Sequence, residues 1–468
     1  MRAVPEERSQ RPRGSEATIV APATPPGPGS VSILRLSGPD AFSISSRLTG
    51  LPPGAHPART LSRCPVRNAA GEEIDTGLVV HFPAPNSFTG EDVAEIHMHG
   101  NPLIVAEAAE SACALGARAA EPGEFSRRAF ENGKMDLTQA EGLCDLILAR
   151  TAASARAALR QLKGGIQDAV TPLRERLLSL LVLLEATIDF SDEEDIAPLS
   201  MLQVKERVSE LRSDLSRYIA SYEIGHLLRD GASVAICGVV NVGKSRLLNR
   251  LLGQERAIVA EVPGTTRDYL SGEAILSGIP VRLIDTAGLR EAGDPVEREG
   301  VRRSREILSG ADLALFLLDA SRPAHEGDRR AYAEIAGRPH FLLRNKSDLP
   351  PVEPGEGFAG PGLKGVLSVS AKTGEGIDGL LAAMGRELAP SEGPILGEAP
   401  MTRLRHVDAA RKAVAALARA EKAAGEGLSP EFPAADVREA SQALAEITGE
   451  IAPEEVLDAI FGSFCIGK

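Results

Sequence analysis

The segment from Gly238 to Ser245 has the residue types and spacing of a phosphate-binding loop. It reads Gly-Val-Val-Asn-Val-Gly-Lys-Ser, follows a strand-like run at 233–237 and precedes a helix-like run at 246–252. Glycines let backbone N–H groups turn towards phosphate oxygens, and the start of a helix adds a favourable dipole. A lysine here reaches the β- and γ-phosphates, and the serine hydroxyl ligates Mg²⁺. The alternative is an ordinary glycine-rich turn. The predicted contacts are Gly238, Asn241, Val242, Gly243, Lys244, Ser245 and Arg246.

Three shorter motifs follow, each directly after a strand-like run, in the order typical of a guanine-nucleotide site. Because parallel strands end at one edge of a sheet, these motifs should meet where open α/β folds bind ligands. We predict that Asp285 holds Mg²⁺ through water and that the N–H of Gly288 contacts the γ-phosphate. Asn345 and Lys346 should brace the base loop. The motif residues are Asp285, Thr286, Ala287 and Gly288, then Asn345, Lys346 and Asp348, then Ser370, Ala371 and Lys372.

Asp348 is predicted to select the base. A carboxylate can accept hydrogen bonds from both N1–H and the 2-amino group of guanine, whereas adenine presents an acceptor at N1 and leaves the acid unpaired. An unsatisfied polar group in a binding site produces strong discrimination. The expected ligands are therefore GTP and GDP.

The segment Gly264-Thr265-Thr266-Arg267-Asp268 lies between the phosphate loop and Asp285. A threonine in this interval is needed to complete Mg²⁺ coordination when the γ-phosphate is present, which makes the loop a switch. We favour Thr266 for this role. A solvated turn is the alternative.

Leu289 stands where Ras-like GTPases use a glutamine to orient the attacking water, and a leucine cannot do so. Acids in the following stretch are candidates for this role. Arg267 and Arg290 could act as transition-state donors, although neither is obvious. Asn241 offers a neutral oxygen near the place of that charge, so a bound monovalent cation is a further hypothesis. The candidate acids are Glu291, Asp294, Glu297 and Glu299.

The elements that must position these residues follow from periodicity. Strand-like and helix-like runs alternate between 231 and 388, which indicates a mostly parallel sheet wrapped by helices. Apolar residues at 173, 177, 180, 181, 184 and 188 mark one helix face. The predicted fold is an α/β P-loop GTPase domain inserted in an all-α helical domain and preceded by an α+β domain. The predicted segments are a disordered tail (1–17), the N-terminal domain (18–132), a first helical segment (133–230), the G domain (231–388) and a second helical segment (389–468).

Composition argues against several classes of protein. The 468 residues carry a net charge of −13, so a broad basic face for nucleic acid is not expected, and RNA would need a partner or a local basic patch. Five scattered cysteines without a C-x-x-C pair argue against a zinc site and suit a reducing cytosol. No apolar run approaches the ~20 residues of a membrane span. The first 17 residues lack a secretory signal and suggest a disordered tail or a start codon assigned too early.

Motifs on both sides of the central set make the chain resemble the MnmE (TrmE) family of tRNA modification GTPases over about residues 18–468. A generic GTPase shares only the central motifs. The chain departs from the family pattern at Val240, which replaces a usual proline, and at Asn101, which replaces a common glycine. The motifs that carry the resemblance are TIVAPATPPG (18–27), PNSFTGED (85–92), PGEFS (122–126), AIVAEVPGTTRD (257–268), LREA (289–292) and FCIGK (464–468).

The resemblance implies a potassium-activated GTPase that forms a homodimer through its G domains. It also implies a hetero-oligomer with a flavin-dependent partner of the MnmG (GidA) type. Together they would add an aminomethyl or carboxymethylaminomethyl group to C5 of the wobble uridine of certain tRNAs. By position, Glu297 would orient the water, and Mg²⁺ would sit on Ser245 and Thr266. Potassium would be held by Asn241, Thr265 and the carbonyls of Ala260 and Val262.

The resemblance further implies a tetrahydrofolate derivative, in a 5-formyl or methylene form, in the N-terminal domain. The matching positions are Arg35, Glu95, Lys134 and Lys468. Cys465 would be a functional thiol near this site. The other predicted catalytic residues, Lys244, Asn241 and Glu297, belong to the GTPase site. A small buried residue at a helix end is the alternative for Cys465. The expected location is the cytoplasm, without a membrane.

Two other functions stay open at this point. A ribosome-assembly GTPase would use GTP as a timer on ribosomal RNA, but that class usually adds a basic RNA-binding domain, and this chain is acidic. A stand-alone folate enzyme with a regulatory G domain would carry out one-carbon chemistry without a flavoprotein.

Overall fold

The computed structural model describes residues 17–52, 54, 57–189, 200–253, 271–286, 308–353, 355–388 and 401–468. The chain divides into two compact units, residues 1–144 with 445–468, and residues 145–444. The two ends of the sequence therefore belong to the same unit. The predicted tail, apart from Ala17, and the Pro/Gly-rich stretch 389–400 lie outside the described residues.

A six-stranded sheet in the order β3-β4-β5-β2-β1-β6 forms the centre of the first unit. Neighbouring strands are antiparallel, except that β1 and β6 pair in parallel. The β-rich sequence runs at 30–36, 77–82 and 93–97 lie within β2, β4 and β5. The strands are β1 (Ile19–Pro22), β2 (Gly29–Ser37), β3 (Ser62–Arg67), β4 (Glu73–Phe82), β5 (Val93–Gly100) and β6 (Arg118–Ala119).

Two helices, α1 (Ala41–Thr49) and α2 (Pro102–Ala114), pack on this sheet. Their core is aliphatic, with Leu34, Leu48 and Ile96 fully buried. A second cluster joins residues from α4 (Leu137–Leu148) to residues from α15 (Glu454–Phe461). Helix α3 (Glu124–Glu131) contacts α15 as well, so the end of the chain is packed into the first unit.

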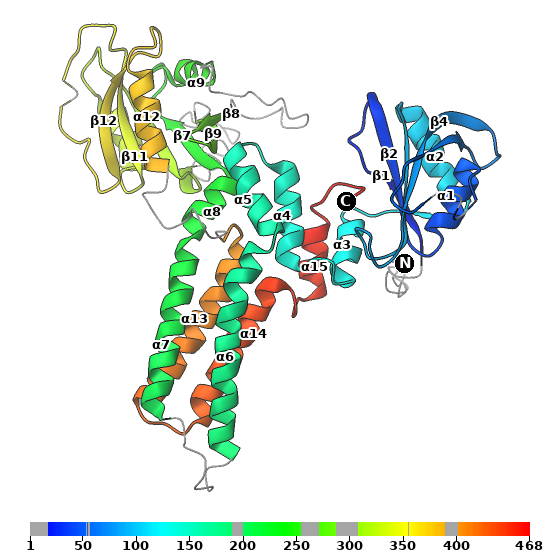
Figure 1. The fold of residues 1–468 in the computed structure, drawn as a ribbon. Helices are drawn as coiled ribbons and strands as arrows, with labels where there is room; N and C mark the ends of the chain where they lie inside the picture. Colours follow the sequence, from blue (N-terminus) through cyan, green and yellow to red (C-terminus); the bar gives the residue numbers. More distant parts are fainter. Residues whose placement is uncertain are drawn as a thin grey trace, which may run out of the picture. The chain divides into compact units, whose positions relative to one another are not determined.

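Long helices and an inserted sheet make up the second unit. Helices α7 and α13 lie along one another (Figure 1). The predicted helix face is confirmed in α6, where Leu177, Leu180, Leu181 and Leu184 are buried. The helices outside the inserted domain are α5 (Ala152–Leu162), α6 (Gly165–Asp189), α7 (Met201–Ala220), α8 (Tyr222–Asp230), α13 (Leu404–Gly425) and α14 (Glu431–Thr448).

The inserted sheet has the strand order β12-β11-β10-β7-β9-β8. All neighbours are parallel except β8 and β9, which form an antiparallel hairpin. The strands are β7 (Ala232–Cys237), β8 (Ser271–Leu276), β9 (Ile279–Asp285), β10 (Leu313–Asp319), β11 (His340–Asn345) and β12 (Leu363–Val369). The strand-like run predicted at 233–237 is confirmed as part of β7, and the alternation of strands and helices predicted between 231 and 388 is also confirmed.

Helices cover both faces of this sheet. Leu315 and Leu317 of β10 join the core under α9 (Lys244–Leu252) and α12 (Ile377–Leu388), whereas Phe316 joins the cluster that contains Tyr332 of α11 (Glu326–Ala333). The alternation places successive side chains of one parallel strand in two cores. The predicted fold class, a mostly parallel P-loop GTPase sheet inserted between helical segments, is confirmed. Among the described helices, none has the length and hydrophobicity that crossing a membrane requires.

Strand β8 was not predicted from the sequence. Its residues, Ser-Gly-Glu-Ala-Ile-Leu, include a single β-branched side chain, and it lies at the edge of the sheet. The available signal was the Ser277-Gly278 pair, whose positive φ values of 51° and 84° make the two-residue turn of a hairpin.

Candidate nucleotide-binding site

The phosphate-binding loop connects β7 to α9, and Gly243 is the residue before the helix. Gly238, Asn241 and Gly243 have φ values of 133°, 65° and 105°. Asparagine is one of the few side-chain-bearing residues that enter this left-handed region readily. A Cβ at Gly243 would overlap the side-chain amide of Asn345. The glycine therefore allows two of the predicted motifs to meet.

Lys244 lies inside this loop, with 6% of its surface exposed. Its ammonium group donates to the carbonyl oxygens of Gly238 and Val239, at 2.7 and 2.8 Å. Burial lowers the pKa of Lys244, and the neighbouring Asp285 opposes that shift. The ammonium group is thus held where phosphate oxygens can replace the two carbonyls.

Ser245 and Asp285 meet at the end of β9. The Ser245 hydroxyl donates to Oδ2 of Asp285 at 2.7 Å, and only 4% of Asp285 is exposed. The next residue, Thr286, donates its hydroxyl to the carbonyl oxygen of Ile236 at 2.8 Å and so ties the end of β9 to β7. Hydroxyl and carboxylate oxygens are the hard ligands that Mg²⁺ prefers. The pair therefore fits the predicted magnesium site.

Asn345 connects the phosphate loop to the base loop. Its Nδ2 donates to the carbonyl oxygen of Val242 at 2.7 Å, and its Oδ1 accepts from the backbone N–H of Ala371 at 3.0 Å. Only 2% of Asn345 is exposed. One side chain therefore fixes the spacing between the phosphate and base ends of the site.

Asp348 is held by the Ser370-Ala371-Lys372 loop. Oδ1 of Asp348 accepts from the Ser370 hydroxyl at 2.7 Å, and the Lys372 ammonium lies 4.0 Å from Oδ2. The Ser370 hydrogen bond lowers the pKa of Asp348, and the charge of Lys372 adds to this. The carboxylate is therefore ionised at neutral pH, which is the form that can accept two N–H groups from guanine.

Ten of the predicted phosphate and base residues line one cavity of about 570 Å³, and Asp285 and Ser370 join them through their hydrogen bonds to Ser245 and Asp348. Val240 and Leu349 also line it and were not predicted as contacts. The lining residues are Val240, Asn241, Gly243, Lys244, Ser245, Arg246, Asn345, Lys346, Asp348, Leu349, Ala371 and Lys372.

Sequence reasoning missed Asp319, at the end of β10. Its Oδ2 accepts from the Lys346 ammonium at 2.6 Å, and its Oδ1 accepts from the backbone and hydroxyl of Ser321. Lys346 has a φ of 68°, unusual for a lysine, so its side chain is anchored beside a strained backbone. The position of Asp319 after a strand, parallel to the one that ends at Asn345, was a usable signal.

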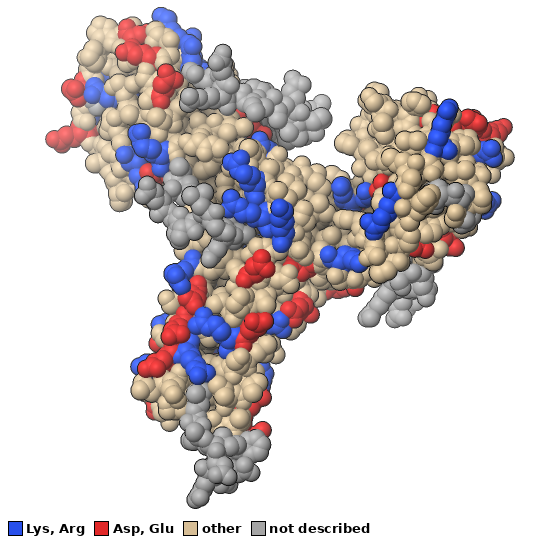
Figure 2. All heavy atoms as spheres, viewed as in Figure 1, with Lys and Arg blue, Asp and Glu red and all other residues tan. Residues whose placement is uncertain are grey.

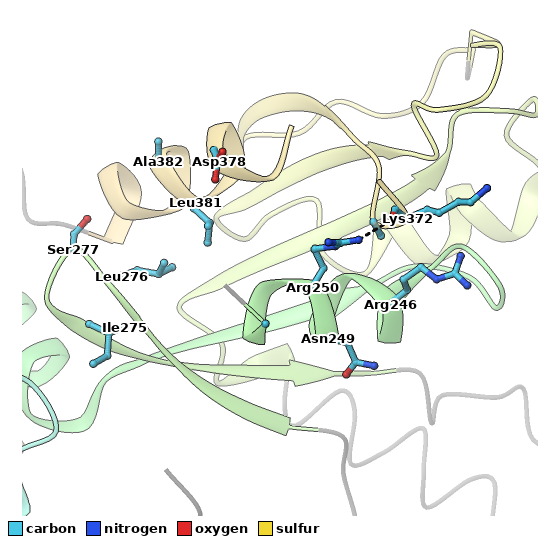
Figure 3. Close-up of a pocket in the computed structure, with 12 residues that line it drawn as sticks. Arg246, Asn249, Arg250, Ile275, Leu276, Ser277, Lys372, Asp378, Leu381 and Ala382 are labelled. Atoms are coloured by element: carbon cyan, nitrogen blue, oxygen red, sulfur yellow. Dashed lines mark hydrogen bonds between the residues drawn. The ribbon is translucent and has the colours of Figure 1, made fainter. Parts of the chain in front are cut away.

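Arg250 is a second residue of this region that the sequence did not predict. It lies on α9 and donates from Nη2 to the carbonyl oxygen of Lys372 at 2.7 Å (Figure 3). This bond crosses one end of a second cavity, of about 1020 Å³, between α9, α12 and the β8–β9 turn. No motif marks Arg250, because the contact joins a helix to a loop 122 residues later in the chain.

Some of the predicted site residues lie outside the described residues. These positions belong to the predicted switch segment, to the motif that begins at Asp285 and to the predicted water-orienting acid. They are Ala260, Val262, Thr265, Thr266, Ala287, Gly288 and Glu297.

A separate polar cluster lies within the first unit. Arg35 donates from Nε to Oε1 of Glu95 at 2.9 Å and from Nη1 to the carbonyl oxygen of Gly467 at 3.4 Å. Its guanidinium group also lies 5.6 and 5.7 Å from the ring centroids of Phe88 and Phe125. The arginine thus connects the sheet to the last residues of the chain.

Lys468 belongs to the same cluster. Its pKa is lowered by burial and by the charge of Arg35, while Glu95 opposes the shift. Lys134 instead packs beside Gly90, and no contact between it and the other three residues is found among the residues that the structure describes. Cys465 is exposed, so the alternative of a buried residue at a helix end is wrong.

A phosphate loop and an Asn-Lys-x-Asp loop at the carboxyl edge of a mostly parallel sheet define the class as a P-loop GTPase. Two family models match the chain. One covers the part before this domain, and the other covers the helical segments on both sides of it. The model described as GTP-binding protein TrmE N-terminus matches residues 18–134, and the MnmE helical domain model matches residues 137–465.

Curated relatives match nearly the whole chain. A tRNA modification GTPase MnmE of Nitrosococcus oceani is 44% identical over 98% of this chain and 99% of its own length. The MnmE of Aquifex aeolicus is 42% identical over 96% and 99%, and that of Rhodopseudomonas palustris 44% over 97% and 99%. The chain therefore belongs to the MnmE family of tRNA modification GTPases. It is a GTP hydrolase that acts in tRNA modification.

Proposed function

We propose that this protein is a potassium-activated GTPase which, with a flavin-dependent partner, adds an aminomethyl or carboxymethylaminomethyl group to C5 of the wobble uridine of certain tRNAs. The observation that carries the proposal is the presence of two separate sites in one chain. The guanine-nucleotide cavity lies in the second unit, and the Arg35–Glu95 cluster, with Gly467 and Lys468, lies in the first. A GTPase that served only as a timer would not need the second site.

Magnesium would be held directly by the Ser245 hydroxyl and by Thr266, with Asp285 acting through water. The 2.7 Å distance between the Ser245 hydroxyl and Oδ2 of Asp285 supports this assignment, because the two oxygens are close enough to surround one ion. When bound, the ion would neutralise charge on the β- and γ-phosphates. Lys244 and the loop N–H groups would hold the same phosphates.

Potassium would be held by Asn241, by Thr265 and by the carbonyl oxygens of Ala260 and Val262. The left-handed backbone of Asn241 and its position on the wall of the nucleotide cavity support a role for its amide oxygen. When bound, the cation would supply the positive charge that an arginine finger supplies elsewhere. Leu289 cannot orient water, so Glu297 is proposed to hold the attacking water.

A tetrahydrofolate derivative, in a 5-formyl or methylene form, would be held by Arg35, Glu95, Lys134 and Lys468. The donor set fits such a ligand, because cations can bind its carboxylates and Glu95 can accept from pteridine N–H groups. Cys465 is proposed as a functional thiol beside this site, which its exposure permits. When bound, the folate would supply the one-carbon unit.

The proposed assembly is a homodimer through the G domains, joined by a flavin-dependent partner of the MnmG type. GTP hydrolysis in the G domains would then be coupled to the modification of tRNA.

The proposed function is tested by mass spectrometry of tRNA nucleosides from cells that lack the protein. We expect the C5-modified wobble uridine to disappear, and to return when the unchanged gene is restored. Restoring a Glu95→Gln variant should leave the modification absent while the purified variant still hydrolyses GTP. An unchanged level of the modified uridine in the deletion strain would refute the proposal.

GTP turnover is expected to be at least about tenfold faster in KCl than in NaCl of equal ionic strength, because the bound cation replaces a transition-state donor. Asn241→Gly removes the amide oxygen but keeps the left-handed backbone accessible. This variant should bind GTP normally and turn over slowly in both salts. Steady-state phosphate release measures both rates. Equal rates for the unchanged protein in the two salts would contradict potassium activation.

A further inference from the structure

We propose that the exposed face of α5 binds the phosphate backbone of RNA. The chain acts in tRNA modification but carries a net charge of −13, so contact with a polyanion requires a local region of opposite sign. Within α5 and at its end, Arg156, Arg160 and Lys163 follow one another at intervals of four and three residues. This spacing places them on one side of the helix. We call these three residues the α5 basic stripe.

The opposite side of α5 is packed against the rest of the second unit. Ala157, Ala158 and Gln161 are buried, and the Ser154 hydroxyl donates to the carbonyl oxygen of Leu228 at 2.5 Å. Helix α5 is therefore fixed in rotation, which leaves the α5 basic stripe on the outward side. Arg156 and Lys163 are exposed and Arg160 is half-buried.

Two of these cations are available to a ligand. No side-chain ion pair or hydrogen bond of Arg156 or Lys163 is found within the described residues. By contrast, Arg150, which precedes the helix, pairs with Glu273. Binding of RNA would therefore not have to break an existing ion pair at Arg156 or Lys163.

Neighbouring segments bring two arginines and two aspartates alongside α5, and their charges balance. The Ser154 contact brings the end of α8 alongside, where Arg229 follows Leu228. The Thr402 hydroxyl donates a hydrogen bond to Oε1 of Gln161 at 3.1 Å, and Arg403 is the next residue in the chain. Arg229 and Arg403 both pair with one carboxylate, that of Asp145, at 3.3 and 2.7 Å. Arg229 also lies 3.4 Å from Asp230.

Because these neighbouring charges cancel, the three cations of the α5 basic stripe leave a local excess of positive charge, although the chain as a whole is acidic. Figure 2 shows Lys and Arg side chains gathered where α5 lies in Figure 1. The stripe spans about 10 Å of helix, at 1.5 Å per residue. Flexible cations over this length can contact adjacent phosphates of one strand without reading the bases. The surface thus fits RNA backbone.

The test is the binding of fluorescently labelled tRNA to the full-length protein at several salt concentrations. Arg156→Glu/Lys163→Glu is the variant, and Lys205→Glu/Arg207→Glu on α7 is the matched control. The control residues are also exposed, and both double variants change the net charge equally. We expect the α5 variant to bind at least about tenfold more weakly than the control at low salt. The slope of log K against log salt should fall by about two, one for each lost phosphate contact.

The charge-preserving variant Arg156→Lys/Lys163→Arg should bind tRNA as the unchanged protein does, and basal GTP hydrolysis should be the same in all variants. Retained hydrolysis shows that the fold is intact, and the experiment does not depend on potassium, folate or the modification reaction. Equal losses in the α5 variant and the control, or an unchanged salt slope, would overturn the proposal. An α5 variant that still binds tRNA normally but no longer binds the flavin-dependent partner would also overturn the proposal. The face would then be a binding surface for an acidic protein.

Discussion

Replacing Asp348 with asparagine is expected to weaken GTP binding on the order of 10³-fold, while binding of XTP improves. The amide can accept only through Oδ1, and its NH₂ group faces an N–H of guanine, so two donors oppose each other. Xanthine carries a carbonyl oxygen in place of the 2-amino group and can pair with this NH₂. Competition titration of GTP, XTP and ATP against a fluorescent nucleotide measures the change.

Asp378→Asn is the matched control for this substitution. Asp378 lies in the first turn of α12 and lines the second cavity, not the nucleotide cavity. The control should bind GTP as the unchanged protein does. If Asp348→Asn kept its preference for GTP, then the base would be selected by another group and the assignment of this loop would be wrong.

Lys244→Ala is expected to reduce kcat/KM for GTP by about 10³-fold, the scale found when one preorganised donor to the transition state is removed. The loss should appear in kcat as well as in nucleotide affinity, because the ammonium group contacts charge that grows during phosphoryl transfer. Single-turnover hydrolysis with excess enzyme separates the two effects.

Lys364→Ala controls for the loss of a lysine. Lys364 is on β12 and pairs with Glu387, away from the nucleotide cavity. It should hydrolyse GTP normally. A Lys244→Ala protein that kept kcat and lost only affinity would show that Lys244 binds the ground state and transition state equally, contrary to the role assigned to it.

The sequence was sufficient to predict the features that depend on local pattern. The alternation of strands and helices indicated the inserted sheet, and the spacing of leucines indicated α6, because periodicity follows directly from which face is buried. The phosphate and base motifs were also recognisable, since each is a short run fixed by the chemistry of its ligand. Most of the described members of these motifs line one cavity.

Contacts between distant segments could not be predicted in this way. Arg35 and Gly467 are separated by 432 residues, and nothing in either local sequence indicates their contact. The pairing of Asp319 with Lys346 and the bond from Arg250 to Lys372 depend on which strands and helices become neighbours. Such contacts follow from topology, so they become visible only when the elements are placed in space.

The composition of the first unit from both ends of the chain has a consequence for biosynthesis. Residues 445–468 leave the ribosome after all of β7 to β12 has been made. The core of the N-terminal sheet is built from residues between Val20 and Ala117, so it does not need the end of the chain. The α4–α15 cluster and the contact between Arg35 and Gly467 can form only after the GTPase sheet has been made. The first unit is therefore completed last, although its sheet is among the first parts of the chain to be synthesised.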